Sequence, residues 1–396
     1  MLFREIEHQE RAVSILLRAL AGGRVHHAYL FEGPEGVGKE TAARALTAGL
    51  LCLDPLRAPT DDPCGQCDSC RLLASDNHPD YRLIHRGLHK QHPDKSIRDS
   101  KGLFLVVDVI RHFLIEPAST RSTLGRRRVF LIRDAERMNE GAQNALLKTL
   151  EEPPGEACLI LISSSGERLL PTIRSRCQRI PFDLLPKAFI AQKMLEQTEI
   201  EPSAAGALAA LSEGRLGAAL QWHRIGLLTT LAQTAQILAN GLPSKPEAFG
   251  KALLEIADGL AIRTIEQVEH FADENDSRDE TGGGKTKSSA KVETDDLRAA
   301  LKLTFMLIAA VHRDAMAMRA ASESQGAHGA SSAPRILPDG TPAIMELARG
   351  ATADELGESI RAVAVAERML DRNVSPQLVC EHLAIGLSGE KATMQS

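Results

Sequence analysis

A glycine-rich segment near the N-terminus has the composition of a loop that holds phosphate groups. It reads Gly33-Pro34-Glu35-Gly36-Val37-Gly38-Lys39, after a predicted strand and before a predicted helix. The glycines let backbone N–H groups turn toward phosphate oxygens, the helix start adds positive partial charge, and Lys39 adds a full charge for the β- and γ-phosphates. The alternative is a glycine-rich turn that binds nothing, but the flanking strand and helix favour a nucleotide-type loop.

The magnesium ligands that should accompany such a loop are replaced. Ser or Thr is expected after the lysine because its hydroxyl ligates Mg²⁺, but the chain has Glu40 there and Thr41 one position late. A shift of one residue rotates a helical side chain by about 100°, so Thr41 does not substitute. In the strand predicted at 128–133, Arg133 occupies the place of the metal-side Asp, which leaves Asp134, while Glu136 is expected to face solvent.

Two independent departures therefore affect the handling of Mg²⁺. We predict a phosphate-loop fold that binds ATP or ADP weakly or not at all and does not hydrolyse it. The residues of this degenerate nucleotide site are Gly33, Gly36, Gly38, Lys39 and Thr41.

Four of the seven cysteines form a candidate metal site: Cys52, Cys64, Cys67 and Cys70. Four thiolates close a tetrahedral zinc site, and since no coordination position is left open, the predicted role of zinc is structural. An iron–sulfur site is the alternative, but that pattern adds a cysteine three residues later followed by proline, and this chain has none there. Free thiols in a loop are a second alternative.

Histidines follow the cysteines and offer a different ligand set. One of them could replace Cys52 in a mixed site of cysteine and histidine. The four are His78, His85, His89 and His92.

Composition limits the class of protein. The length of 396 residues corresponds to two or three domains, and 43% apolar with 25% charged residues is typical of a soluble globular chain. The net charge of −5 argues against a dedicated non-specific DNA-binding protein, and 10 Phe, 2 Tyr and 1 Trp provide few stacking platforms for single strands. No signal peptide and no apolar run of membrane-spanning length is present, so the expected compartment is the cytoplasm.

The elements that position these residues change along the chain. Strands are predicted at 28–32, 81–85, 128–133, 158–163 and 178–181, with helices at about 39–51, 106–114 and 139–151 between them. Such alternation predicts an α/β module with a largely parallel sheet over 1–182. The rest is all-helical: a small domain at 183–225 and a larger one at 226–396, with mobile insertions at about 273–296 and 321–342.

Several segments resemble a known family. They are HHAYLF at 26–31 leading into the phosphate loop, NALLKTLEEPP at 144–154, IRSRC at 173–177 and, more weakly, RNVSP at 372–376. In these segments the chain is similar to the delta-prime subunits of DNA polymerase III, which are AAA+ proteins of the bacterial clamp loader. The resemblance extends over about 1–225 and implies an AAA+ module, a helical lid and a helical collar that oligomerises.

The resemblance also implies a function. It implies a hetero-pentamer with gamma/tau and delta subunits, which loads the sliding clamp onto primer-template DNA at the expense of ATP, within the DNA polymerase III holoenzyme and without a membrane. Each ATP lies between neighbours, and Arg176 matches the arginine that reaches into the adjacent subunit's site. A guanidinium is always charged and can fork onto phosphate oxygens, which suits it to this catalytic role in trans.

Two rival interpretations remain. An ATP-hydrolysing gamma/tau-like motor would have intact nucleotide motifs, whereas this chain departs at Glu40, at Arg133 and at Gly217, where an ATPase subunit would place its sensor arginine. A zinc-stabilised AAA+ adaptor outside replication is the second rival. Together the three departures favour the delta-prime type, for which we expect no intrinsic ATPase activity.

Overall fold

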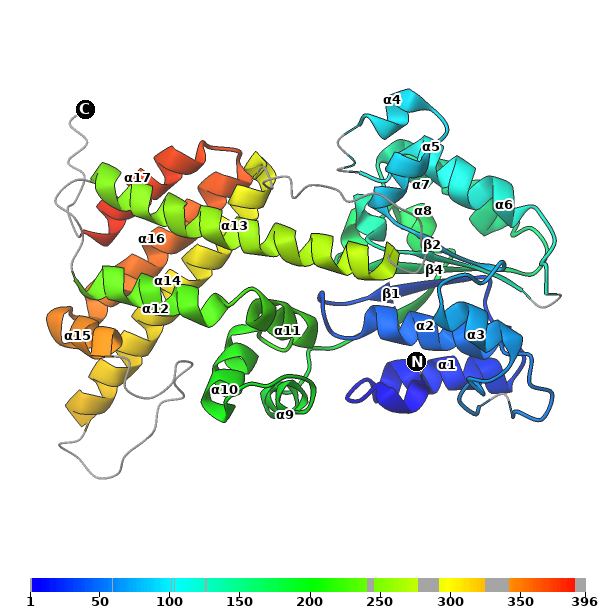
Figure 1. The fold of residues 1–396 in the computed structure, drawn as a ribbon, viewed down its shortest axis with the longest axis horizontal. Coiled ribbons are helices and arrows are strands. Elements are labelled where there is room, and N and C mark those ends of the chain that lie inside the picture. Colours follow the sequence, from blue (N-terminus) through cyan, green and yellow to red (C-terminus); the bar gives the residue numbers. More distant parts are fainter. Residues whose placement is uncertain are drawn as a thin grey trace. The chain divides into compact units, whose positions relative to one another are not determined.

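The computed structural model describes residues 2–58, 60–100, 102, 104–124, 127–240, 246–276, 292–324 and 342–388 (Figure 1). The chain forms two compact units. The first comprises Met1–Pro186 with Gly214–Gly217, and the second comprises Lys187–Glu213 with Ala218–Ser396.

The first unit is built on a five-stranded sheet in which every strand pairing is parallel. Its order is β2-β3-β4-β1-β5. The strands are β1 (Ala28–Glu32), β2 (Tyr81–Ile84), β3 (Arg128–Ile132), β4 (Ala157–Ser163) and β5 (Gln178–Pro181). Each lies within one residue of its predicted range, because apolar runs covered on both faces give a clear signal. The predicted α/β class with a parallel sheet is confirmed.

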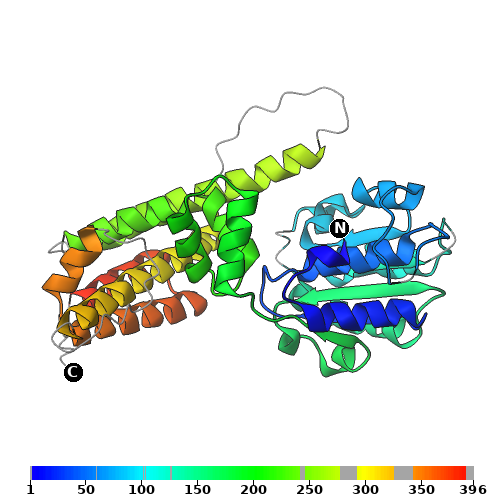
Figure 2. The same ribbon diagram turned by 90° about the horizontal axis from the view of Figure 1, so that it is seen from below.

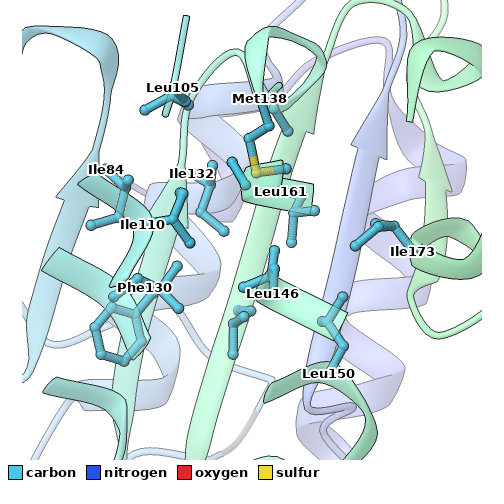
Figure 3. Close-up of a cluster of buried hydrophobic side chains, with 14 of the residues drawn as sticks. Ile84, Leu105, Ile110, Phe130, Ile132, Met138, Leu146, Leu150, Leu161 and Ile173 are labelled. Atoms are coloured by element: carbon cyan, nitrogen blue, oxygen red, sulfur yellow. The ribbon is translucent and has the colours of Figure 1, made fainter. Parts of the chain in front are cut away.

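Helices cover both faces of this sheet. One face packs against α1 (Glu10–Ala21) and α2 (Lys39–Leu51), where Tyr29 and Phe31 of β1 are buried with Leu46. On the other face, shown in Figure 3, Leu146 and Leu150 lie with Phe130 in one buried cluster. They come from α7 (Glu140–Glu151), which Asn139 caps by accepting a hydrogen bond from the backbone N–H of Ala142 at 2.8 Å.

The connection between β2 and β3 differs from the prediction of one helix at 106–114. It contains α4 (Lys95–Arg98), α5 (Val107–Ile110), a π-helical turn over Arg111–Ile115 and α6 (Glu116–Ala118). The wide turn lies directly before Pro117, which has no N–H and whose ring crowds the preceding turn of a helix. The helix therefore continues past its predicted end through a local widening.

The second unit is all-helical, as predicted, and its longer helices lie alongside one another (Figure 2). Helix α14 packs against α13, α15 and α16, and α17 packs against α13 and α16. The helices are α9 (Lys187–Gln197), α10 (Pro202–Leu211), α11 (Leu216–Arg224), α12 (Leu227–Ala239), α13 (Pro246–Asp276), α14 (Thr294–Ser324), α15 (Pro342–Gly350), α16 (Ala353–Asp371) and α17 (Pro376–Leu387). Among the described residues, none of the helices is both long and apolar enough to span a bilayer.

The predicted insertions fall mainly outside the described residues. Of the insertion at 273–296, residues 277–291 lie outside them, and the flanks belong to α13 and α14. Of the insertion at 321–342, residues 325–341 lie outside them. The division into domains at 182 and 225 stays a prediction.

Gly33 provides a test of the phosphate-loop backbone. Its φ is +150°, and a Cβ there would lie 2.3 Å from the carbonyl oxygen of Phe182. We expect Gly33→Ala to lower the free energy of unfolding by about 3 kcal/mol, because backbone strain and a clash with main chain add. Denaturant unfolding measures this. Gly141→Ala, whose Cβ would meet only ordinary contacts in α7, is the control and should leave stability unchanged or slightly higher.

Candidate functional site

The phosphate loop joins β1 to α2, and its lysine binds carbonyl oxygens of the same loop. Gly36 and Gly38 have positive φ values of 79° and 99°, and α2 begins at Lys39. The Lys39 side chain is buried, and its Nζ donates hydrogen bonds to the carbonyl oxygens of Gly33 and Pro34, each at 2.5 Å. The cation that would bind phosphate therefore satisfies carbonyl groups of its own loop.

Acidic groups surround this lysine. Burial lowers the pKa of Lys39, while the nearby charges of Glu136, Glu35 and Asp134 act in the opposite direction. The pKa of Lys39 lies below its ordinary value, since burial outweighs these charges. The charge of Lys39 is thus already opposed by carboxylates of its own chain.

Glu136, predicted to face solvent, is half-buried and is held by hydrogen bonds. Asp134 adopts a left-handed φ of 53°, which turns the chain into a short 3₁₀ turn at Ala135–Arg137 and directs Glu136 to the end of β4. Its Oε1 accepts hydrogen bonds from the backbone N–H of Ser164, at 3.2 Å, and from the Ser164 hydroxyl. Burial works to raise the pKa of Glu136, but hydrogen bonds from Ser164, from the Glu136 backbone and from Ser163 together outweigh it, and the pKa lies below its ordinary value.

Glu40 and Arg133, the two departures from the expected magnesium ligands, form an ion pair with each other. Nη2 of Arg133 lies 2.5 Å from Oε1 of Glu40, so the end of β3 is tied to the first turn of α2. Parallel strands bring their carboxyl ends to one edge of the sheet, which is why residues far apart in the chain meet here. The opposite charges at the two positions are the only signal of this pair in the sequence, because local patterns do not show which distant residues meet.

The ion pair belongs to a short chain of charges. Nε of Arg44 lies 3.3 Å from Oε1 of Glu40, and Nη1 of Arg44 lies 3.0 Å from Oδ1 of Asp76. Burial works to raise the pKa of Glu40, but Arg133 and then Arg44 outweigh it and hold the pKa below its ordinary value. The Glu40 carboxylate is ionised and neutralised by arginine.

These side chains do not fit a magnesium nucleotide. A divalent ion would have to displace Arg133, whose charge is permanent, from a carboxylate that already has two cationic partners. The hydroxyl of Thr41 offers no replacement, because Thr41 is exposed while Lys39 beside it is buried.

A second segment packs directly on the loop. The backbone N–H of Gly217 donates to the carbonyl oxygen of Gly36 at 3.0 Å, and Leu185 N–H donates to the carbonyl oxygen of Gly214 at 2.9 Å. A Cβ at position 217 would lie 2.9 Å from Cα of Gly36. Glycine is required at 217 by this close approach, which excludes an arginine side chain from the position.

The four cysteines predicted as ligands lie together. Their sulfur atoms are all within 4.8 Å of one another, with Cys52 3.6 Å and Cys70 4.0 Å from Cys64. Metal–sulfur bonds of about 2.3 Å in a tetrahedron place sulfur atoms about 3.8 Å apart, so the cluster could hold one metal ion. Backbone N–H groups of Cys67 and Gln66 lower the pKa of Cys64 to about 7, which favours its thiolate.

The neighbouring His78 supports this segment and is not a ligand. Its Nδ1 accepts from the backbone N–H of Asp80 at 3.0 Å, so its Nε2 carries the proton and donates to the Ser69 hydroxyl at 2.9 Å. Ser69 in turn donates to the carbonyl oxygen of Leu51 at 2.7 Å. Burial lowers the pKa of His78, consistent with this neutral form. Within the described residues the cluster contains cysteines alone.

Arg176 lies at the amino end of the parallel strands, whereas the phosphate loop lies at their carboxyl end. It follows α8 (Pro171–Arg174) and precedes β5, whereas the loop follows the carboxyl end of β1, a parallel neighbour of β5. A strand of five residues spans about 17 Å, so Arg176 does not reach its own loop. Its Nη2 lies 2.6 Å from Oε1 of Glu151, and its Nη1 donates to the carbonyl oxygen of Thr172 at 2.9 Å. The sequence did not predict this contact of Arg176 with Glu151.

Comparisons with known proteins agree with the motifs. Residues 8–186 match the family described as "DNA polymerase III, delta subunit". The chain is 39% identical over 221 residues to the DNA polymerase III subunit delta' of Pseudomonas aeruginosa, covering 54% of this chain and 62% of that protein. It is 35% identical over 203 residues to subunit delta' of Bacillus subtilis, covering 51% and 56%.

A gamma/tau relative also matches. The DNA polymerase III subunit gamma/tau of Mycobacterium tuberculosis is 37% identical over 184 residues, covering 46% of this chain and 29% of that protein. The chain thus spans about three fifths of the length of the delta' relatives. The predicted resemblance to the delta-prime subunits is confirmed for the N-terminal part of the chain.

The Glu40–Arg133 pair predicts a dependence of stability on pH. Because the folded pKa of Glu40 is depressed, its contribution is complete above the unfolded pKa near 4.5 and is lost as pH falls through the folded pKa. We expect Glu40→Gln to lower the free energy of unfolding by about 1 kcal/mol at pH 7, a value discounted for partial exposure, and by progressively less below pH 4.5. Denaturant titrations at several pH values measure this.

The control is Glu35→Gln, which removes an exposed carboxylate of the same loop and should match the wild type at pH 7. Equal stability of Glu40→Gln and wild type at pH 7 would contradict a stabilising role for the ion pair.

Proposed function

We propose that this chain is a delta-prime-type subunit of a DNA polymerase III clamp loader, and that it serves a neighbouring ATPase subunit without hydrolysing ATP itself. In this role it takes part in the ATP-dependent loading of the sliding clamp onto DNA. The family match and the relatives named delta' support the assignment.

One observation carries the proposal: the residues at the two ends of the parallel strands have different arrangements. At the carboxyl edge, Glu40 and Arg133 fill the magnesium positions with an ion pair. At the amino edge, Arg176 is about a third exposed and lies beyond reach of its own loop. An arginine placed in this way can act only on a phosphate that another subunit brings, and such an arginine stabilises the charge of phosphoryl transfer.

The Glu40–Arg133 pair also argues against the rival gamma/tau-type motor. Its relatives match this chain as well, so identity alone does not separate the two types. An ATPase needs a divalent ion bridging the β- and γ-phosphates, and the Arg133 guanidinium holds that region with a permanent charge. The assignment therefore depends on these side chains.

We infer zinc as the metal of the cysteine cluster. Four thiolates in tetrahedral spacing suit zinc, and a closed set of four protein ligands leaves no position for water or substrate. Its role is to hold a loop and α3 (Asp68–Ala74) against the end of α2, so it is structural. A [4Fe–4S] cluster is the alternative because it also takes four thiolates.

The proposed partners follow from the clamp-loader assignment. They are gamma/tau and delta subunits in a hetero-pentamer, with the sliding clamp and primer-template DNA reached through the complex, in the cytoplasm. The other rival, a zinc-stabilised AAA+ adaptor outside replication, would not associate with these subunits. Co-purification with gamma/tau and delta separates the two.

Substitution of Arg176 tests the proposed function. In a complex with one ATP-hydrolysing gamma/tau-type subunit, we expect Arg176→Ala to lower ATP turnover at the shared site by about a thousandfold, because it removes a cation from the transition state. Assembly, measured by size-exclusion chromatography, should persist. The chain alone should show only background hydrolysis.

Arg137→Ala removes another exposed arginine and is the matched control, with turnover like the wild type. Undiminished turnover in the Arg176→Ala complex would contradict the role of Arg176 at the neighbouring subunit's ATP. Hydrolysis by the isolated chain at an ordinary rate would favour the gamma/tau-type motor.

Metal analysis tests the cysteine cluster. We expect about one zinc ion per chain, and its loss in Cys64→Ser should lower the free energy of unfolding by about 3 kcal/mol, the linkage expected for an ion at 100 times its dissociation constant. Cys380→Ala removes a buried cysteine outside the cluster and should keep the full metal content. Iron with inorganic sulfide in place of zinc would favour the cluster alternative, and no soft metal at all would refute the site.

A further inference from the structure

Arg176 is fastened to its own chain at two points. Nη2 pairs with Glu151, the last residue of α7, and Nη1 donates to the carbonyl oxygen of Thr172 in α8. These contacts come from two separate helices. A long flexible side chain at the surface is therefore held in one orientation before any partner arrives.

The stability of the fold does not account for this arrangement. The side chains of Arg176 and Glu151 are 34% and 49% exposed. Ion pairs at such exposure are screened by water and contribute little to folding, since the Coulomb gain is offset by the entropy of fixing two long side chains. The orientation of the guanidinium is what the pair determines.

The contacts leave donors free for a phosphate. A guanidinium has five N–H groups, and Glu151 and Thr172 each engage one nitrogen. Three N–H groups remain, one on each Nη and one on Nε, in a rigid planar fork. The remaining N–H groups can bind phosphate oxygens while the two contacts keep the guanidinium in place.

We propose that Glu151 is a positioning residue for Arg176. It sets the guanidinium in the orientation that a neighbouring subunit's phosphate requires, so that the ordering of the arginine side chain is complete before the subunits meet. Ordering in advance lowers the barrier without adding a contact to the nucleotide. This inference rests on the proposed function, because it assumes that Arg176 acts in trans.

Substitutions of Glu151 test the proposal in the full chain assembled with one gamma/tau-type subunit. We expect Glu151→Ala to lower kcat for ATP by roughly fivefold, the fold-change for ordering one long side chain. The KM for ATP should stay unchanged, because Glu151 does not contact the nucleotide. Glu151→Gln keeps an oxygen that accepts from Nη2, and we expect it to restore at least half of the wild-type kcat.

The control is Glu152→Ala, which removes the adjacent exposed carboxylate and should behave like the wild type. Turnover is expressed per assembled complex, and thermal unfolding of each variant confirms the fold. A merely structural role would lower the unfolding temperature of Glu151→Ala, and equal losses in Gln and Ala variants would mean that only charge matters. Either result overturns the positioning role.

Arg176→Ala measured in parallel separates this inference from the proposed function. If Arg176→Ala abolishes turnover and Glu151→Ala matches the wild type, the positioning role fails and the function in trans stands. If Arg176→Ala leaves turnover intact, the function in trans fails and the positioning role fails with it.

Discussion

The contact between Glu40 and Arg133 constrains everything else at the carboxyl edge of the sheet. Both residues stand at positions where the sequence predicts ligands of a magnesium ion, and their charges are opposite, so they neutralise each other. Arg44 adds a second positive charge to the same carboxylate. Because arginine does not lose its proton at accessible pH, both arginines keep their positive charge beside this carboxylate.

Other polar groups around the phosphate loop are also hydrogen-bonded within the protein. Lys39 donates to carbonyl oxygens of its own loop, and Gly217 brings a backbone N–H onto Gly36. The Ser164 N–H and hydroxyl are taken up by Glu136. Side-chain donors around the loop thus find acceptors within the protein, which holds the loop in shape without a ligand.

The phosphate loop and Arg176 lie at opposite ends of the parallel strands, so the two sites are structurally separate. Arg176 and Glu151 lie where α8 and α7 lead into β5 and β4, at the amino edge, so the closure around Glu40 leaves them unchanged. The cysteine cluster is a third, independent feature, because its four thiols come from a loop and a short helix at the end of α2. Each feature depends on the parallel sheet for its place.

The sequence by itself determined the strands, the phosphate loop and the cysteine cluster, since apolar runs, glycine spacing and cysteine spacing act between near neighbours in the chain. Only the tertiary structure decided which charges meet. Glu40 and Arg133 are 93 positions apart, and Glu151 and Arg176 come from different helices. Such pairs are set by strand order and register, which local periodicity does not encode, and the turn at Asp134 that redirects Glu136 is likewise a property of the folded edge.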